Sequence, residues 1–170
     1  MEPHHLGRDG PEGSYRSAGL RARDPLQDVC TEEAVMNALE EGTKLTLDFL
    51  KLQKVAETKQ AVVPAVLQHA DTKEVLFIGY ANELALQETQ KTRRAVLWST
   101  SRNELWRKGE TSGDVLDLVE IRINCEQNSL LYIVRPRKGG VCHTKDASGQ
   151  TRVGCYYRRV TGSEKGLAFV

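Results

Sequence analysis

Three cysteines and one histidine in the second half of the chain are the residues best suited to chemistry. Cys142 is followed directly by His143, and Cys125 and Cys155 lie on either side of this pair. Thiolate and imidazole are both zinc ligands; three protein ligands and an open position are typical of catalytic zinc, and four ligands of structural zinc. The spacing is not that of a CxxC knuckle, so it leaves both kinds of site open, depending on whether His143 is a ligand.

Oxygen-bearing side chains flank Cys125. In an extended strand, Asn124, Glu126 and Asn128 point to one face, while Cys125 points to the other. Oxygen atoms suit hard cations such as Mg²⁺, and thiolate suits zinc, so one strand end could serve two ions. The alternative is a small buried cysteine beside a solvated polar edge, and this strand alone favours that interpretation because unpaired cysteines are commonly buried.

Both tryptophans of the chain lie in one polar run, LWSTSRNELWRKGETSG, over residues 97–113. Hydroxyl groups, cations and glycine amides are suited to binding phosphate, and an indole can pack on a base or a sugar. The alternative is a polar hairpin with two half-buried tryptophans. The candidate substrate-binding residues are Trp98, Ser99, Ser101, Arg102, Trp106, Lys108, Glu110, Thr111 and Ser112.

Composition narrows the class of protein. The chain has 170 residues, 24 Lys plus Arg and 23 Asp plus Glu, for a formal net charge of +1. This balance argues against a nucleic-acid coat, and no apolar run approaches the ~20 residues of a membrane span. The N-terminus lacks the apolar core of a secretory signal, so we expect a cytoplasmic protein with reduced cysteines and a small-molecule ligand.

We predict a flexible tail over residues 1–30, and the elements that position the site residues begin after it. Cys30 lies in this tail, and we expect it to take no part in the site. A single domain is predicted over residues 31–170. Thr31 can cap a helix that ends at Gly42, and Asn82 can cap a second helix through about residue 90, with Leu84, Ala85 and Leu86 facing inward.

Strands are predicted from alternating or continuous apolar residues. They cover residues 45–49, 60–69, 75–80, 95–99, 115–125 and 129–134. The second and third form a hairpin, Pro64 indicates an edge or a bulge, and the last strand is central because it is apolar on both faces. The fold class is therefore α+β, with mainly antiparallel strands and two or three helices.

Four ordered blocks resemble the phosphoribosyl-AMP cyclohydrolase family of histidine biosynthesis. They are VVPAVLQHADTKEVLFIGYANELAL, LWSTSRNELWRKGETSG, VEIRINCEQN, and KGGVCHT followed by CYYR. The resemblance covers residues 47–158 approximately and implies an interlocked homodimer that opens the adenine ring of 1-(5-phosphoribosyl)-AMP between N1 and C6 with zinc-activated water.

The resemblance also implies roles for individual residues. Cys125 of one subunit and Cys142 and Cys155 of the other would bind zinc, and His143 would be the general acid/base or a further ligand. Positions 124, 126 and 128 would hold Mg²⁺.

The chain departs from the family pattern at two places. The family usually has Asp-Cys-Asp-x-Asp, where this chain has Asn124-Cys125-Glu126-Gln127-Asn128, and each lost carboxylate weakens attraction for Mg²⁺. The segment between His143 and Cys155 is about six residues longer than usual, which costs little closure entropy but can reshape a pocket.

These departures keep two further hypotheses open beside an active cyclohydrolase. One is a diverged hydrolase acting on another purine nucleotide. The other is a non-catalytic, zinc-stabilised dimer that binds nucleotide. A zinc-dependent nucleic-acid binder is disfavoured, because no Lys/Arg stripe persists along one face.

Overall fold

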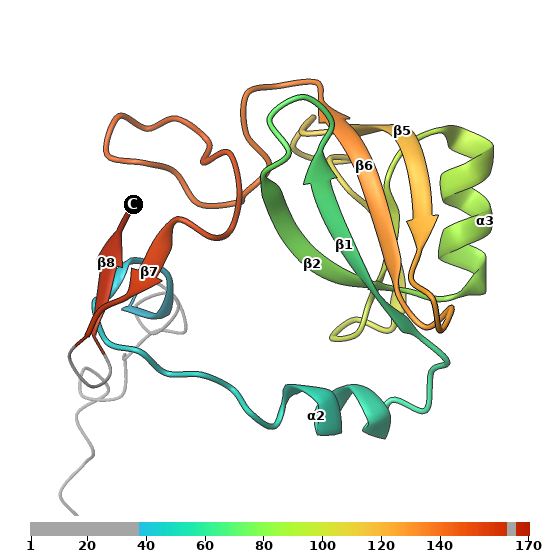
Figure 1. Cartoon of the computed structure of the whole chain (residues 1–170), viewed down its shortest axis with the longest axis horizontal. Coiled ribbons are helices and arrows are strands. Elements are labelled where there is room, and N and C mark those ends of the chain that lie inside the picture. The colour runs from blue at the N-terminus through green and yellow to red at the C-terminus, as the bar shows by residue number, and fades with distance from the viewer. Residues whose placement is uncertain (1–37, 163–165) are drawn as a thin grey trace, which may run out of the picture. The chain divides into compact units, whose positions relative to one another are not determined.

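A six-stranded mixed sheet contains most of the regular structure. The computed structural model describes residues 38–162 and 166–170, which belong to one compact unit, residues 37–170. The sheet order is β4-β3-β2-β1-β6-β5, and Figure 1 shows β1 between β2 and β6. The strands are β1 (Val63–His69), β2 (Val75–Ala81), β3 (Val96–Ser99), β4 (Glu104–Arg107), β5 (Leu116–Ile123) and β6 (Leu130–Pro136).

The predicted α+β class is confirmed. Neighbouring strands of the sheet pair antiparallel except β1 and β6, which are parallel. The predicted hairpin is β1–β2, closed by a hydrogen bond from the Lys73 amide to the His69 carbonyl. A separate two-stranded sheet pairs β7 (Arg158–Val160) with β8 (Leu167–Phe169). In the described part of the chain, no helix has the length and apolar character that crossing a bilayer requires.

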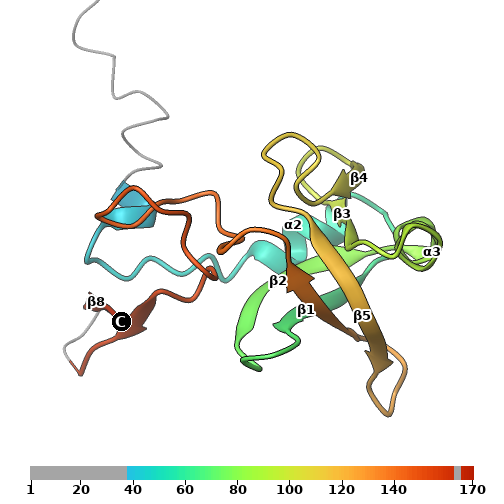
Figure 2. The same cartoon turned by 90° about the horizontal axis from the view of Figure 1, so that it is seen from above.

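Helix α3 (Glu83–Thr92) begins as its sequence predicts. The Asn82 side chain accepts a hydrogen bond from the Ala85 amide at 2.9 Å, so it caps the helix. The helix lies against β2, β3 and β4, as Figure 2 shows beside that end of the sheet. Ala85 and Thr89 are its buried residues, whereas Leu84 is 48% exposed, so the prediction that Leu84 faces inward is wrong.

The strand predicted over residues 45–49 is also wrong. This segment has no regular strand and leads into helix α2 (Lys51–Glu57), which the apolar pattern did not predict. Leu47 and Phe49 are 62% and 87% exposed, so their alternation meets no neighbouring strand. The helix predicted from Thr31 lies mostly outside the described residues, as does the predicted tail; residues 38–41 are helical and end before Gly42 as expected.

Pro64 lies in an interior strand, not at an edge, and the β1–β2 irregularity lies between Leu67 and Gln68. The parallel pairing of β1 with β6 starts at Ala65, so the missing amide hydrogen of proline precedes that ladder. Strand β6 is interior, as predicted. The core is built from the inward-facing residues of the sheet, among them Leu67, Leu76, Leu97, Leu116, Tyr132 and Val134.

Candidate metal and nucleotide site

Strand β5 ends two positions before Cys125, which corrects the predicted strand over residues 115–125. Residues 125 and 126 form a turn, in which the Gln127 amide donates to the Asn124 carbonyl at 3.0 Å. A register shift between Leu118 and Glu120 also changes the alternation within the strand. Cys125 is therefore an exposed turn residue and not part of the strand's apolar face.

The loop that contains Cys142 is held by main-chain hydrogen bonds to the segment ahead of Cys155. The amides of Val141 and Cys142 both donate to the Arg152 carbonyl, at 3.0 and 3.1 Å, and the Arg152 amide donates to the Thr144 carbonyl. Glycine is required at position 140, because a Cβ there would lie 2.2 Å from the Thr151 carbonyl oxygen. The two cysteine-bearing segments are thus brought into close approach.

The thiols of Cys142 and Cys155 lie next to each other, with 3.8 Å between their Sγ atoms. Cys142 is 3% exposed, and its Sγ is also 3.1 Å from Thr144 Oγ1. Cys155 has exposed atoms, yet desolvation of its thiol and the adjacent Cys142 raise its pKa to about 12. The positive charge of Lys108 acts in the opposite direction, so Lys108 lies within electrostatic reach of this thiol.

This thiol pair fits zinc. Zn–S bonds of about 2.3 Å at a tetrahedral angle separate two sulfurs by about 3.8 Å, the separation observed here. Within the described residues, no group of three or more Cys, His, Asp or Glu side chains comes together. Cys142 and Cys155 are thus brought together within one chain, whereas Cys125 is not brought to them.

His143 extends from the same loop and is largely exposed. Its Nε2 is hydrogen-bonded to Glu40 Oε1, and its side chain is 73% exposed. Glu40 therefore orients the imidazole from the segment that precedes the sheet.

The three side chains at positions 124, 126 and 128 do come together, but they form hydrogen bonds with one another. Asn124 Oδ1 accepts hydrogen bonds from the amides of Asn128 and Ser129, at 3.0 and 2.9 Å. Asn124 Nδ2 donates to Asn128 Oδ1 at 2.7 Å, and Asn128 Nδ2 donates to Glu126 Oε2 at 2.9 Å. With one carboxylate and two side-chain amides that donate inward, this cluster does not fit Mg²⁺.

The candidate substrate-binding residues fall into two groups. Trp98, Ser99, Ser101, Arg102 and Trp106 belong to the β3–β4 hairpin, in which Arg102 pairs with Glu104 and both tryptophans are half-buried. The hairpin expected as the alternative is therefore present. Trp98 Nε1 is a buried donor with no hydrogen-bond partner in the described structure.

The second group is Lys108, Glu110, Thr111 and Ser112, and its first two members line a cavity of about 360 Å³. Lys108 and Glu110 contribute to its wall, together with Arg94 and Arg107, and three of these four are cations. Gly109 has a φ of +82°, and a Cβ there would lie 2.3 Å from the Asp114 carbonyl carbon. Thr111 and Ser112 are exposed beside this wall, and the Ser112 carbonyl accepts from Lys138 Nζ at 2.9 Å.

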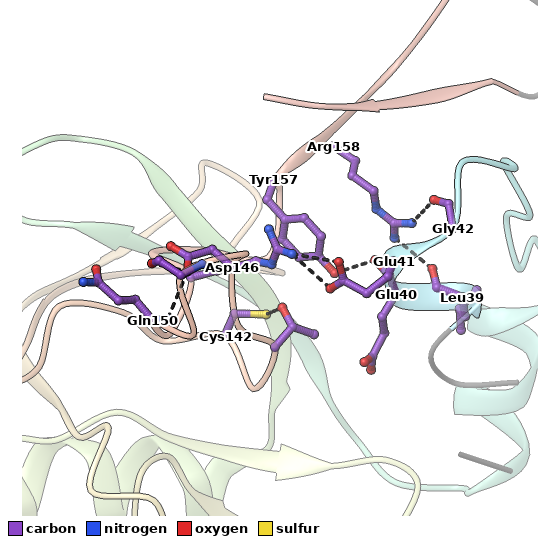
Figure 3. A network of polar contacts seen from close by, with 12 residues as sticks. Leu39, Glu40, Glu41, Gly42, Cys142, Asp146, Gln150, Tyr157 and Arg158 are labelled. Carbon is purple, nitrogen blue, oxygen red and sulfur yellow. Dashed lines mark hydrogen bonds and ion pairs between the residues drawn. The ribbon is translucent and has the colours of Figure 1, made fainter. Parts of the chain in front are cut away.

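Sequence reasoning missed the polar network that surrounds the cysteine loop (Figure 3). It joins Glu41 to Arg152, the Glu40 carbonyl to Tyr157, and the carbonyls of Leu39 and Gly42 to Arg158, across more than 100 positions of the chain. The only signals in the sequence were the acidic pair before Gly42 and the CYYR block, and neither indicates its partner.

Together these features place the chain among α+β proteins with a candidate thiol metal site beside a cationic cavity. Comparison with known proteins narrows this class. The sequence model of the family described as "Phosphoribosyl-AMP cyclohydrolase" matches residues 77–157. The Archaeoglobus fulgidus phosphoribosyl-AMP cyclohydrolase is 47% identical over 106 residues, which are 62% of this chain and 92% of that protein.

Two further relatives point to the same family. The Caulobacter vibrioides phosphoribosyl-AMP cyclohydrolase is 48% identical over 98 residues, 57% of this chain and 66% of that protein. The Thermus thermophilus histidine biosynthesis bifunctional protein HisIE is 41% identical over 121 residues; the match covers 71% of this chain and about half of that protein, 53%. The chain therefore belongs to the phosphoribosyl-AMP cyclohydrolase family, and it is a hydrolase of histidine biosynthesis.

Proposed function

We propose that this chain hydrolyses 1-(5-phosphoribosyl)-AMP at the N1–C6 bond of its adenine ring, with zinc held by Cys142, Cys155 and the Cys125 of a second copy. The observation that carries the proposal is the 3.8 Å separation of the Cys142 and Cys155 sulfurs, beside the charge of Lys108. This separation matches two thiolates on one zinc ion. Lys108, whose charge lowers the pKa of the Cys155 thiol, is also a residue of the cavity wall.

Zinc, when bound, supplies a water molecule with a lowered pKa, so that hydroxide is available near neutral pH. The ribosyl group on N1 makes C6 of the purine electron-poor, which favours attack there. His143 is suited to move the proton that N1 needs as its bond to C6 breaks. Because its Nε2 is paired with Glu40, its Nδ1 is the nitrogen suited to this exchange.

The residues that line the cationic cavity bind the substrate. Arg94, Arg107 and Lys108 offer cationic donors to the substrate's phosphates, and charge-assisted hydrogen bonds of this kind are stronger than neutral ones. We assign no step to Mg²⁺, because the donors of Asn124 and Asn128 occupy the oxygens that a cation would need.

Turnover is tested with the purified full chain, phosphoribosyl-AMP and Zn²⁺, by following the ultraviolet change that accompanies ring opening. Cys142→Ser should lose both zinc and turnover, and Cys30→Ser, the matched control, should keep both. Activity that survives Cys142→Ser contradicts the zinc role. Substrate binding without turnover in the wild-type chain favours a non-catalytic nucleotide-binding dimer, and turnover only with other purine nucleotides favours a diverged hydrolase.

A further inference from the structure

Arg152 lies within the loop that joins the two thiols, and its main chain holds Cys142 in place. Its carbonyl accepts the amides of Val141 and Cys142, and its amide donates to Thr144. Because of these hydrogen bonds, a shift of the Arg152 backbone also shifts the backbone of Cys142, and with it the position of Cys142 relative to Cys155.

The Arg152 side chain is fixed by groups from outside the loop. Its Nη2 donates to both carboxylate oxygens of Glu41, at 3.0 and 2.8 Å. Its guanidinium lies 4.1 Å from the centre of the Tyr157 ring and 5.3 Å from that of Phe169. The side chain is 12% exposed, and its Nε is buried without a hydrogen-bond partner in the described structure, so Glu41 supplies the compensating charge.

Glu41 is itself held by the segment around Tyr157 and Arg158. Tyr157 Oη donates to the Glu40 carbonyl at 2.9 Å. Arg158 donates to the carbonyls of Gly42 and Leu39, at 2.8 and 2.9 Å, and thereby satisfies the end of the helical segment over residues 38–41. Figure 3 shows Glu41 in the segment next to Tyr157 and Arg158. Glu41, the partner of Arg152, thus belongs to a segment that precedes the family-matched residues 77–157.

We propose that Glu41 and Arg152 are positioning residues for the zinc-binding thiols. Glu41 fixes the Arg152 side chain, and Arg152 fixes Cys142 opposite Cys155 through its main chain. The proposal rests on the zinc site of the proposed function. The need for such a restraint follows from loop length, because the 12 residues that separate Cys142 from Cys155 have many conformations to exclude.

The test is the zinc affinity of the metal-free full chain, measured by competition with a chromophoric chelator. Glu41→Gln keeps the size of the side chain and removes its charge, and Arg152→Lys keeps a charge and removes the planar fork. Each should weaken zinc binding by about tenfold, the lower end of the effect of groups that orient metal ligands. Glu120→Gln, which disrupts the exposed ion pair of Glu120 with Arg122, is the matched control and should leave affinity unchanged.

Two further readouts separate positioning from general stability. The Co²⁺–thiolate absorption bands of Glu41→Gln should shift or weaken, and Glu41→Gln combined with Arg152→Lys should weaken zinc binding no more than either alone. Wild-type zinc affinity and wild-type Co²⁺ bands in Glu41→Gln overturn the proposal. Should Glu41→Gln not fold, Glu41→Asp is measured instead, with the same criteria. A wild-type chain that binds no zinc overturns the zinc site and, with it, this inference, whereas a zinc-binding wild type with unaffected variants overturns the inference alone.

Discussion

Two amide side chains follow the end of β5 at positions where the resemblance leads us to expect carboxylates, and the difference concerns more than charge. A carboxylate can only accept hydrogen bonds when it is ionised, whereas an asparagine amide also donates two. Asn124 and Asn128 use these donors on Asn128 and Glu126, so the turn is held without a cation. In a carboxylate version, the same oxygens would repel one another unless a cation lay between them.

We therefore predict that Asn124→Asp combined with Asn128→Asp raises Mg²⁺ affinity by about tenfold or more, because it restores negative charge and removes both inward donors. Isothermal titration with Mg²⁺ measures the change. Gln127→Glu is the control, since it adds charge to the same turn outside the hydrogen-bonded set. An equal gain in Gln127→Glu, or no gain in the double variant, contradicts a ligand-specific effect.

The chemistry of single residues was the part of the site most accessible to sequence reasoning. Cys142 and Cys155 drew attention through residue type, and the structure brings them together. Glu41 and Arg152 could not have been predicted as a pair, because charged residues are common in any sequence. Their pairing depends on a tertiary arrangement that joins positions 111 residues apart.

At the scale of elements, Thr89 joins helix α3 to the sheet. Its hydroxyl lies 2.8 Å from the Ala85 carbonyl and 3.0 Å from the Val96 carbonyl, and the Val96 amide donates to the same oxygen at 3.0 Å. The side chain is fully buried. These hydrogen bonds fix the position of helix α3 relative to β3, the first strand of the β3–β4 hairpin that contains both tryptophans.

We predict that Thr89→Val lowers the free energy of unfolding by about 1–3 kcal/mol, because it keeps the shape and leaves buried backbone groups of Val96 without their partner. Urea unfolding of the full chain measures this. Thr92→Val removes an exposed hydroxyl whose hydrogen-bond partner among the described residues is the Glu88 carbonyl, and it should change stability by less than about 0.5 kcal/mol. Equal losses in the two variants would point to helix propensity as the cause.

The sequence predicted those elements that depend on residues close together in the chain. It failed for elements that depend on pairing with residues far away in the chain. The Asn82 cap and the β1–β2 turn are local, and both are present. The alternation over residues 45–49 required a neighbouring strand that the described fold does not supply. The early end of β5 follows from Asn124, whose side chain accepts backbone amides and closes the turn.

At the scale of the molecule, two observations support assembly with a second copy. Leu47, Phe49, Leu50 and Leu52 are each more than half exposed, and apolar side chains gathered in one segment are typical of a contact surface. Cys125 is exposed, and it is not brought into one metal-binding group with Cys142 and Cys155 in the described chain. The proposed zinc site, completed by Cys125 of a second copy, would account for both, since a two-fold dimer makes every contact between its chains twice.

This arrangement predicts that two inactive variants restore activity when mixed. Cys125→Ser retains the Cys142–Cys155 pair, and Cys142→Ser retains Cys125, so a mixed dimer contains one intact site and one doubly altered site. After unfolding and refolding an equal mixture, random pairing makes half of the dimers mixed, and activity and zinc content should reach about one quarter of the wild-type values. Each variant refolded alone is the control and should stay inactive. If an affinity tag on one variant co-purifies the other and the mixture still stays inactive, Cys125 is not supplied by the second copy. In that case each zinc site is built within one chain, and each chain of the mixture lacks one of its three cysteine ligands.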